Sequence, residues 1–326
     1  MLASGGAFAA LALAVAVPAL LGKRVAPVLT ALAHGSPRWL LLAVVGFVLA
    51  FAATVCAWRA AFTAAGATIA PGEAAARLGI GCLVNAVAPA KLGDAVKVAL
   101  CSQAIQGRAR LWTGGGVYAA LAAARSLPLA AVVVAASATG ALPLWPVFAL
   151  CGIAACVALT ARLSSRVRTH PRLADLLAGM GSLARSPRTA ATVIGWSAVV
   201  QVSRLLAAAA AAHALGIPHP ALAALVIVPA LDLAGVFPLT PGSIGIGSGA
   251  VAVVLASRGI GVTEALGVGV AIQAIETLVS FCTGGLGALY LARGNASVRR
   301  WTLRAAVVGS SLAAAALVGV LWLDLV

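Results

Sequence analysis

Long runs of apolar residues dominate the chain, and polar residues lie mostly in short segments between them. A helix that spans a bilayer core about 30 Å thick needs roughly 20 predominantly apolar residues. Runs of this kind predict seven membrane-spanning helices, at 6–22, 39–62, 111–136, 141–161, 190–214, 262–291 and 303–325. Because no basic residue precedes the first run, we interpret 1–22 as a retained extra helix and not as a signal peptide.

Two further apolar stretches, at about 76–104 and 220–258, are interrupted by Pro, Gly and charged residues. A proline inside a helix removes a backbone hydrogen bond and clashes with the preceding turn, so neither stretch forms one continuous helix. Both breaks contain the pattern P-x-x-[L/I]-G, from Pro89 to Gly93 and from Pro241 to Gly245, at an offset of 152 residues. The same offset places helix 39–62 on 191–214, which indicates an internal repeat.

The repeat predicts one integral membrane domain, 1–326, in which a basic loop at 162–189 joins a first unit, 39–161, to a second, 190–325. If each break is a re-entrant hairpin, each unit crosses the membrane an odd number of times and the two units are inverted, as in many transporters. If each broken stretch crosses fully, the units are parallel and the chain has nine spans. The Lys and Arg positions fit both topologies.

Non-helical backbone at membrane depth is tolerated where it lines a cavity, and each break is charged or rich in glycine, so we favour the hairpins. The expected fold is therefore an all-α polytopic membrane bundle of seven full spans plus two re-entrant hairpins, arranged as an inverted repeat.

Composition supports this class, because 63% of the residues are hydrophobic, 9% are charged and the mean hydropathy is +1.10. These values exclude a soluble globular domain and a disordered chain. The formal net charge of +15 comes mostly from Lys and Arg between apolar runs, as in cytoplasmic loops of multi-pass proteins, so we expect no nucleic-acid partner. The segment 162–188 contains six Arg and predicts a cytoplasmic loop with a surface helix at 172–184. We expect a multi-pass protein of the cytoplasmic membrane.

Six ionisable residues fall inside predicted membrane segments, where such groups are costly and often functional. They are Lys91, Asp94, Arg125, Arg204, Asp232 and Glu276. One interpretation is that they neutralise one another as interhelical ion pairs. The other is a polar cavity that binds an anionic group through the three cations, with the carboxylates restraining those cations or carrying a coupling proton.

The glycines of GSIGIGSG (242–249) fit either a phosphate-binding backbone loop or close helix packing. The sequence contains no nucleotide-binding fingerprint, no H-E-x-x-H motif and no Cys/His spacing typical of a metal site. We therefore expect no enzymatic activity, no metal and no cofactor.

The two breaks resemble the flippase-like transmembrane region of the lysylphosphatidylglycerol synthases. The first matches the family pattern P-x-[R/K]-x-G-[D/E] at Pro89, Lys91, Gly93 and Asp94. The second matches P-x-T-P-G-G-[L/I]-G-x-x-E at Pro238, Thr240, Pro241, Gly242, Ile244 and Gly245. Ser243, Ser248 and Ala124 stand where the family pattern has glycine or acidic residues.

The resemblance implies translocation of a lipid or a lipid-linked glycan with an anionic headgroup, and not aminoacyl transfer. Lys91 and Arg125 would contact the phosphate, and the prolines and glycines of the breaks would serve as hinges: Pro89, Gly93, Pro238, Pro241, Gly242 and Gly245. The alternatives are a non-transporting scaffold or partner of a glycosyltransferase or another envelope-biogenesis enzyme, and a transporter of small solutes or ions.

Overall fold

The structure, a computed structural model, describes residues 35–88, 92–106, 109–140, 142, 148, 171–235 and 245–294. Within these ranges the chain is entirely helical, as expected, with nine α-helices and the short 3-10 helix η2 (Ala292–Gly294). Four helices are long and apolar enough to cross a membrane: α2 (Pro37–Ala64), α5 (Arg110–Ala138), α8 (Pro187–Ala214) and α11 (Val262–Leu291).

The four long helices coincide with four of the seven expected spans. The other three expected spans, 6–22, 141–161 and 303–325, lie outside the described residues apart from Leu142 and Phe148. The expected surface helix is present as α7 (Pro171–Ala184), which packs on the beginning of α5.

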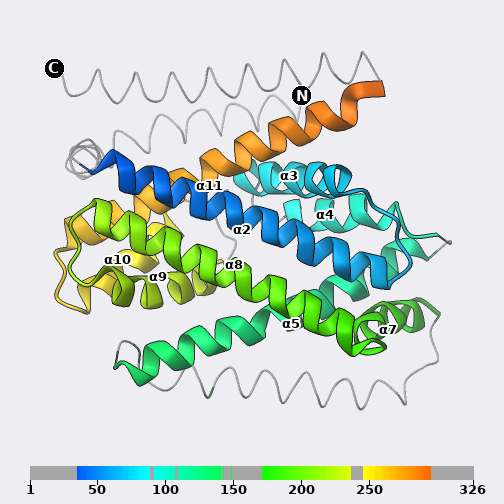
Figure 1. Ribbon diagram of the computed structural model, residues 1–326, viewed down its shortest axis with the longest axis horizontal. Coiled ribbons are helices and arrows are strands. Elements are labelled where there is room, and N and C mark those ends of the chain that lie inside the picture. Colours follow the sequence, from blue (N-terminus) through cyan, green and yellow to red (C-terminus); the bar gives the residue numbers. More distant parts are fainter. Residues whose placement is uncertain are drawn as a thin grey trace, which may run out of the picture.

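Helices α2 and α8 form a central antiparallel pair (Figure 1). The Ser36 N–H, just before α2, donates to the Ala214 carbonyl at the end of α8, at 3.1 Å. More than two turns further along the pair, a Cβ on Gly46 would lie 2.8 Å from the Ala207 Cβ, so only glycine allows this approach. Small residues at such contacts let two membrane helices approach closely. The two helices therefore run in opposite directions along much of their length.

Each broken stretch folds as two short helices that lie side by side. The first gives α3 (Pro71–Val87) and α4 (Leu92–Ser102), which run antiparallel, with Gly81 against Gly93 and the Arg77 Nη1 donating to the Leu100 carbonyl at 2.7 Å. The second gives α9 (Pro220–Ala234) and α10 (Ile246–Ala256). With a rise of about 1.5 Å per residue, each of these helices is shorter than a bilayer core.

The two pairs of short helices lie towards opposite ends of the long helices in Figure 1. Each pair belongs to its own hydrophobic core. One core joins α9 and α10 to the first half of α2 and the second half of α8, and the other joins α3 and α4 to the second half of α2 and to α5. The element order long, short, short, long thus occurs twice, in α2–α5 and in α8–α11.

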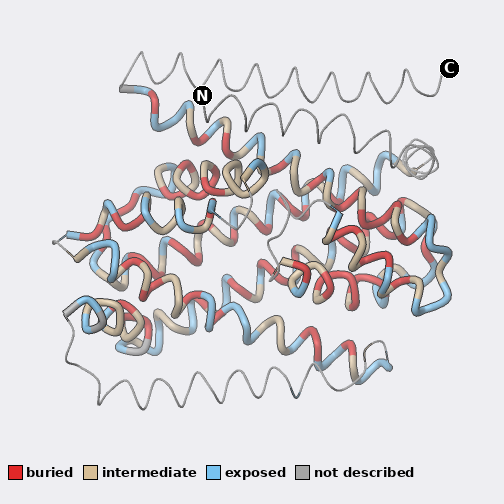
Figure 2. Tube along the Cα trace, turned by 180° about the vertical axis from the view of Figure 1, so that it is seen from behind, coloured by how far each residue is buried: buried red, intermediate tan, exposed pale blue. Residues whose placement is uncertain are grey.

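Buried residues face neighbouring helices, whereas exposed residues follow the outer sides of the bundle (Figure 2). Many of the exposed residues are large and apolar, such as Leu41 at 65% exposure on α2 and Leu206 at 64% on α8. Apolar outer faces of this extent are typical of helices that contact lipid.

Glycines bring α3 and α11 into close contact. A Cβ on Gly287 would lie 2.5 Å from the Ala76 carbonyl oxygen, and a Cβ on Gly284 would overlap the Leu83 side chain. Because backbone and Cβ atoms cannot move away as a flexible side chain can, larger residues at these positions must separate the helices.

We therefore expect Gly284→Val to lower the free energy of unfolding by about 1–3 kcal/mol, the usual range for overpacking a core. Denaturant titration of the purified protein in detergent measures this change. Gly285→Val is the matched control, because a Cβ at Gly285 meets nothing within 4 Å. Equal stability of the two variants would contradict the packing described for α3 and α11.

Candidate functional site

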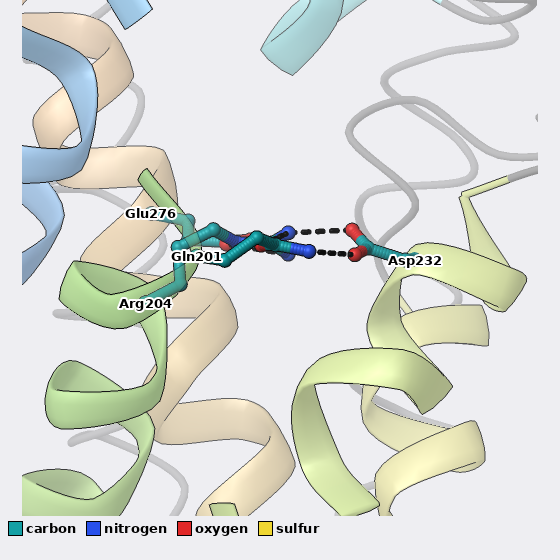
Figure 3. A network of polar contacts seen from close by, with 4 residues as sticks. All are labelled: Gln201, Arg204, Asp232 and Glu276. Carbon is teal, nitrogen blue, oxygen red and sulfur yellow. Dashed lines mark hydrogen bonds and ion pairs between the residues drawn. The ribbon is translucent and has the colours of Figure 1, made fainter. Parts of the chain in front are cut away.

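An ion pair between α8 and α9 lies at the centre of the candidate site. The Arg204 Nη1 lies 2.5 Å from the Asp232 Oδ1. Gln201, one turn before Arg204 on the same face of α8, donates from its Nε2 to the other oxygen of Asp232 at 3.4 Å. Figure 3 shows Gln201 and Arg204 pointing together from α8 towards Asp232 on α9. Both Asp232 oxygens therefore have a partner.

Glu276 adds a second carboxylate from α11. Its Oε1 lies 4.0 Å from the Arg204 Nη2, so the guanidinium lies between two carboxylates that come from different helices. The exposed fraction of the side chain is 15% for Arg204, 23% for Asp232 and 31% for Glu276, so Glu276 is the most accessible of the three. Residues from α8, α9 and α11 thus form a charged triad with one cation and two anions.

A cavity of about 180 Å³ lies beside this triad, between α5, α8 and α9, and is partly open. It is large enough for several water molecules or a small polar group. Gln201 and Asp232 form part of its wall, opposite residues of α5. The complete lining is Ala122, Arg125, Ser126, Leu129, Ser197, Val200, Gln201 and Asp232.

Arg125 is the cation on the α5 side of this cavity. Its side chain is exposed, and it forms no hydrogen bond or ion pair with a residue that the structure describes. A guanidinium in this setting is costly in a membrane unless an anion neutralises it. Arg125 is therefore available to bind an anionic ligand.

A second polar cluster ties the first pair of short helices to α5. The Asp94 carboxylate accepts three hydrogen bonds: from the Lys97 Nζ at 2.8 Å, the Asn85 Nδ2 at 2.9 Å and the Tyr118 hydroxyl at 3.2 Å. Three donors satisfy most of what one ionised carboxylate can accept. Asp94 therefore holds α3, α4 and α5 together.

Helix α5 connects the two polar clusters. Tyr118 and Arg125 are seven residues apart, two helical turns, so they share one face of α5. Arg125 also lies within electrostatic range of Lys97 and of the Tyr118 hydroxyl. One face of α5 thus carries polar groups from the Asp94 cluster to the cavity.

The structure brings together some of the residues expected from the sequence. Arg204, Asp232 and Glu276 form the triad, Arg125 lies across the cavity from Asp232, and Asp94 lies in the second cluster. Their roles in binding stay predictions. Lys91, Pro89, Pro238, Pro241 and Gly242 lie outside the described residues.

Two expected hinge glycines have distinct backbone settings. At Gly93 a Cβ would overlap the Gly81 carbonyl oxygen and the Asn85 side chain, so this glycine permits close packing of α3 and α4. Gly245, which precedes α10, has φ +87° and ψ −44°, a conformation that side-chain-bearing residues rarely adopt.

Sequence reasoning missed Lys97 and Tyr118. Lys97 follows Asp94 by three residues, a spacing that places two side chains on one helix face, so this partner was detectable from the sequence. Tyr118 is distant in sequence, and nothing in the chain marks it as a partner of Asp94.

No group of three or more His, Cys, Asp and Glu side chains in the described part of the chain could hold a metal ion. What the arrangement offers chemically is a guanidinium able to bind an anion and carboxylates able to exchange a proton.

Because removing one member of a buried ion pair leaves the other charge uncompensated, we expect Asp232→Asn to lower the free energy of unfolding by about 3 kcal/mol. The double variant Arg204→Gln, Asp232→Asn should recover part of this loss, which a double-mutant cycle of denaturant titrations measures. Strictly additive single effects would contradict a direct interaction between Arg204 and Asp232.

Comparison with known proteins agrees with a helical membrane architecture. No curated protein sequence matches the chain. A family model described as the lysylphosphatidylglycerol synthase TM region matches residues 5–284, which is most of the sequence and includes all but the last turns of α11. The chain therefore belongs to the lysylphosphatidylglycerol synthase transmembrane-region family of integral membrane proteins.

Proposed function

We propose that this protein moves the anionic headgroup of a lipid across the cytoplasmic membrane through the cavity between α5, α8 and α9. The observation that carries the proposal is Arg125, a cation on the cavity wall that no described side chain neutralises. A guanidinium forms strong, often bidentate hydrogen bonds with a phosphate group. A phosphate in the cavity would therefore supply the counter-charge that Arg125 lacks.

The opposite wall of the cavity is compatible with an anion. Asp232 also lines the cavity, but Arg204 neutralises it at 2.5 Å and Gln201 contacts its other oxygen. The volume of about 180 Å³ suits a phosphate or a small headgroup and is too small for two acyl chains. We infer that the acyl chains stay in the lipid while only the headgroup enters the protein.

We further infer that the two units are inverted. Helices α2 and α8 are the first helices of the two units, and they run antiparallel. An odd number of crossings per unit gives this direction, whereas four crossings per unit would leave α2 and α8 parallel. The antiparallel contact between α3 and α4 supports a re-entrant hairpin in the first unit. If the expected spans at 6–22, 141–161 and 303–325 are included, this arrangement gives seven full crossings.

The charges at the two ends of the bundle support an orientation. One end of the bundle is formed by the last turns of α2 and α11, the first two turns of α3, the first turns of α5 and α8, and the segment 171–186. This end carries most of the described arginines: Arg59, Arg77, Arg110, Arg172, Arg185, Arg188 and Arg293. The opposite end carries Arg38 and Arg258. Because cytoplasmic segments are enriched in Lys and Arg, we assign the arginine-rich end to the cytoplasm.

The proposal predicts that Arg125→Ala slows the translocation of a fluorescent phosphatidylglycerol in proteoliposomes. Loss of a charged hydrogen bond of about 1.5–3 kcal/mol corresponds to a rate at least about tenfold lower. Arg125→Lys should retain part of the rate, because it keeps the charge. Arg110→Ala, which removes an exposed arginine at the start of the same helix, is the control.

Wild-type translocation in the Arg125→Ala variant would exclude Arg125 as the headgroup ligand. If the wild-type protein itself moves no lipid and co-purifies with a stoichiometric membrane enzyme, a scaffolding function would replace the proposed one.

The inverted arrangement predicts opposite accessibility of two positions, tested by Arg59→Cys and Arg258→Cys in a variant whose six native cysteines are replaced. In intact cells an impermeant maleimide should label position 258 and should reach position 59 only after the membrane is permeabilised. Labelling of both positions from outside is the result expected for nine crossings, and it would overturn the inverted arrangement.

A further inference from the structure

With both carboxylates ionised, the charged triad of α8, α9 and α11 has one excess negative charge. Arg204 is its only cation, while Asp232 and Glu276 supply two carboxylates. An uncompensated charge is expensive inside a membrane, so a triad of this composition needs a further positive charge nearby or a bound proton.

The described helices packed against α11 provide no other counter-charge for Glu276. Arg204 and Asp232 are the charged groups within electrostatic range of Glu276. Helix α10 has no charged residue, and the charged residues of α3 pair with each other, Arg77 with Glu73 at 2.5 Å. The charged residues and the histidine that remain on α2 and α8 lie near the helix ends: Arg38, Arg59, Arg188 and His213.

Arg125, which forms no ion pair with the triad, is the cation on the opposite wall of the cavity that Asp232 lines. Asp232 and Arg125 line the same cavity of about 180 Å³, so the triad and Arg125 together sum to zero charge. An anionic headgroup bound at Arg125 removes this balance, because the guanidinium then neutralises the headgroup. The excess negative charge of the triad is left uncompensated.

We propose that Glu276 takes up one proton when an anionic headgroup binds at Arg125, so that headgroup and proton cross the membrane together. This inference rests on the proposed function, because the headgroup must bind at Arg125. The proton comes from water on the entry side, forms an O–H bond with the Glu276 carboxylate and returns to water when the headgroup leaves. Nothing is oxidised or reduced, and the loaded site stays electrically neutral.

The contacts of the two carboxylates assign the proton to Glu276. Asp232 lies 2.5 Å from Arg204 and accepts from Gln201, so protonating it would break the closest ion pair of the site. Glu276 lies 4.0 Å from the same guanidinium and accepts no hydrogen bond from a described residue. It is also the more exposed of the two side chains, at 31% against 23%, so water reaches it more easily.

Calorimetric titration of the detergent-purified protein with dioctanoyl phosphatidylglycerol tests the proposal. Repeating the titration in buffers with different ionisation enthalpies gives both the affinity and the number of protons exchanged. We expect wild-type protein to take up about one proton per bound lipid in the pH range where Glu276 titrates. By linkage the affinity should rise as the pH falls. Glu276→Gln, which is permanently neutral, should bind with no proton uptake and with an affinity independent of pH.

Glu264→Gln is the matched control, because Glu264 is an exposed carboxylate in the first turn of the same helix. This variant should keep the wild-type affinity and proton count. Binding without proton uptake in the wild-type protein, or unchanged uptake in Glu276→Gln, would overturn the proton coupling and leave the proposed function intact. Uptake abolished by Asp232→Asn and retained in Glu276→Gln would also overturn it. Absence of any lipid binding would overturn both proposals.

Discussion

The constraint on which the rest of this structure depends is that a charge inside a membrane needs a counter-charge. Asp232 at 2.5 Å and Glu276 at 4.0 Å supply the counter-charge for the Arg204 guanidinium. These contacts hold α8 against α9 and α11. Asp94 has its counter-charge in Lys97, at 2.8 Å. Arg125 is the exception on the described helices, since no ion pair with them neutralises it. The position of this exception on a cavity wall is the basis of the proposed function.

The packing that positions these charges relies on small residues. Gly46 allows α2 to approach α8, and Gly79, Gly284 and Gly287 allow α3 to approach α11. Helices in lipid gain little from hydrophobic burial against one another, so close backbone contact is an important source of their association. Helix α3 belongs to the first unit and α11 to the second, so this contact, like that of α2 with α8, holds the two units together.

Much of the architecture was predictable, because apolar runs of about 20 residues and internal prolines have direct physical consequences. The sequence predicted the four long helices, the two broken stretches and a helix at 172–184, which is observed as α7. The three-residue spacing of Gln201 and Arg204 also places both side chains on one helix face. The sequence could not pair Arg204 with Asp232, or Tyr118 with Asp94, because such contacts depend on how distant helices pack. Local spacing gives only the partners on the same helix, such as Lys97.

The central claim is that Arg125 holds an anionic lipid headgroup in the cavity beside the triad. Photo-crosslinking from Leu129, which lines the cavity, tests it most directly when compared with Leu127, which is exposed on α5 and is absent from the cavity lining. A benzophenone side chain is introduced at each position, and the crosslinked lipids are identified by mass spectrometry. The adducts at 129 should be enriched in anionic lipid, and this enrichment should vanish when Arg125 is replaced by alanine. Identical lipid profiles at 129 and 127, both matching the surrounding membrane, would contradict the claim.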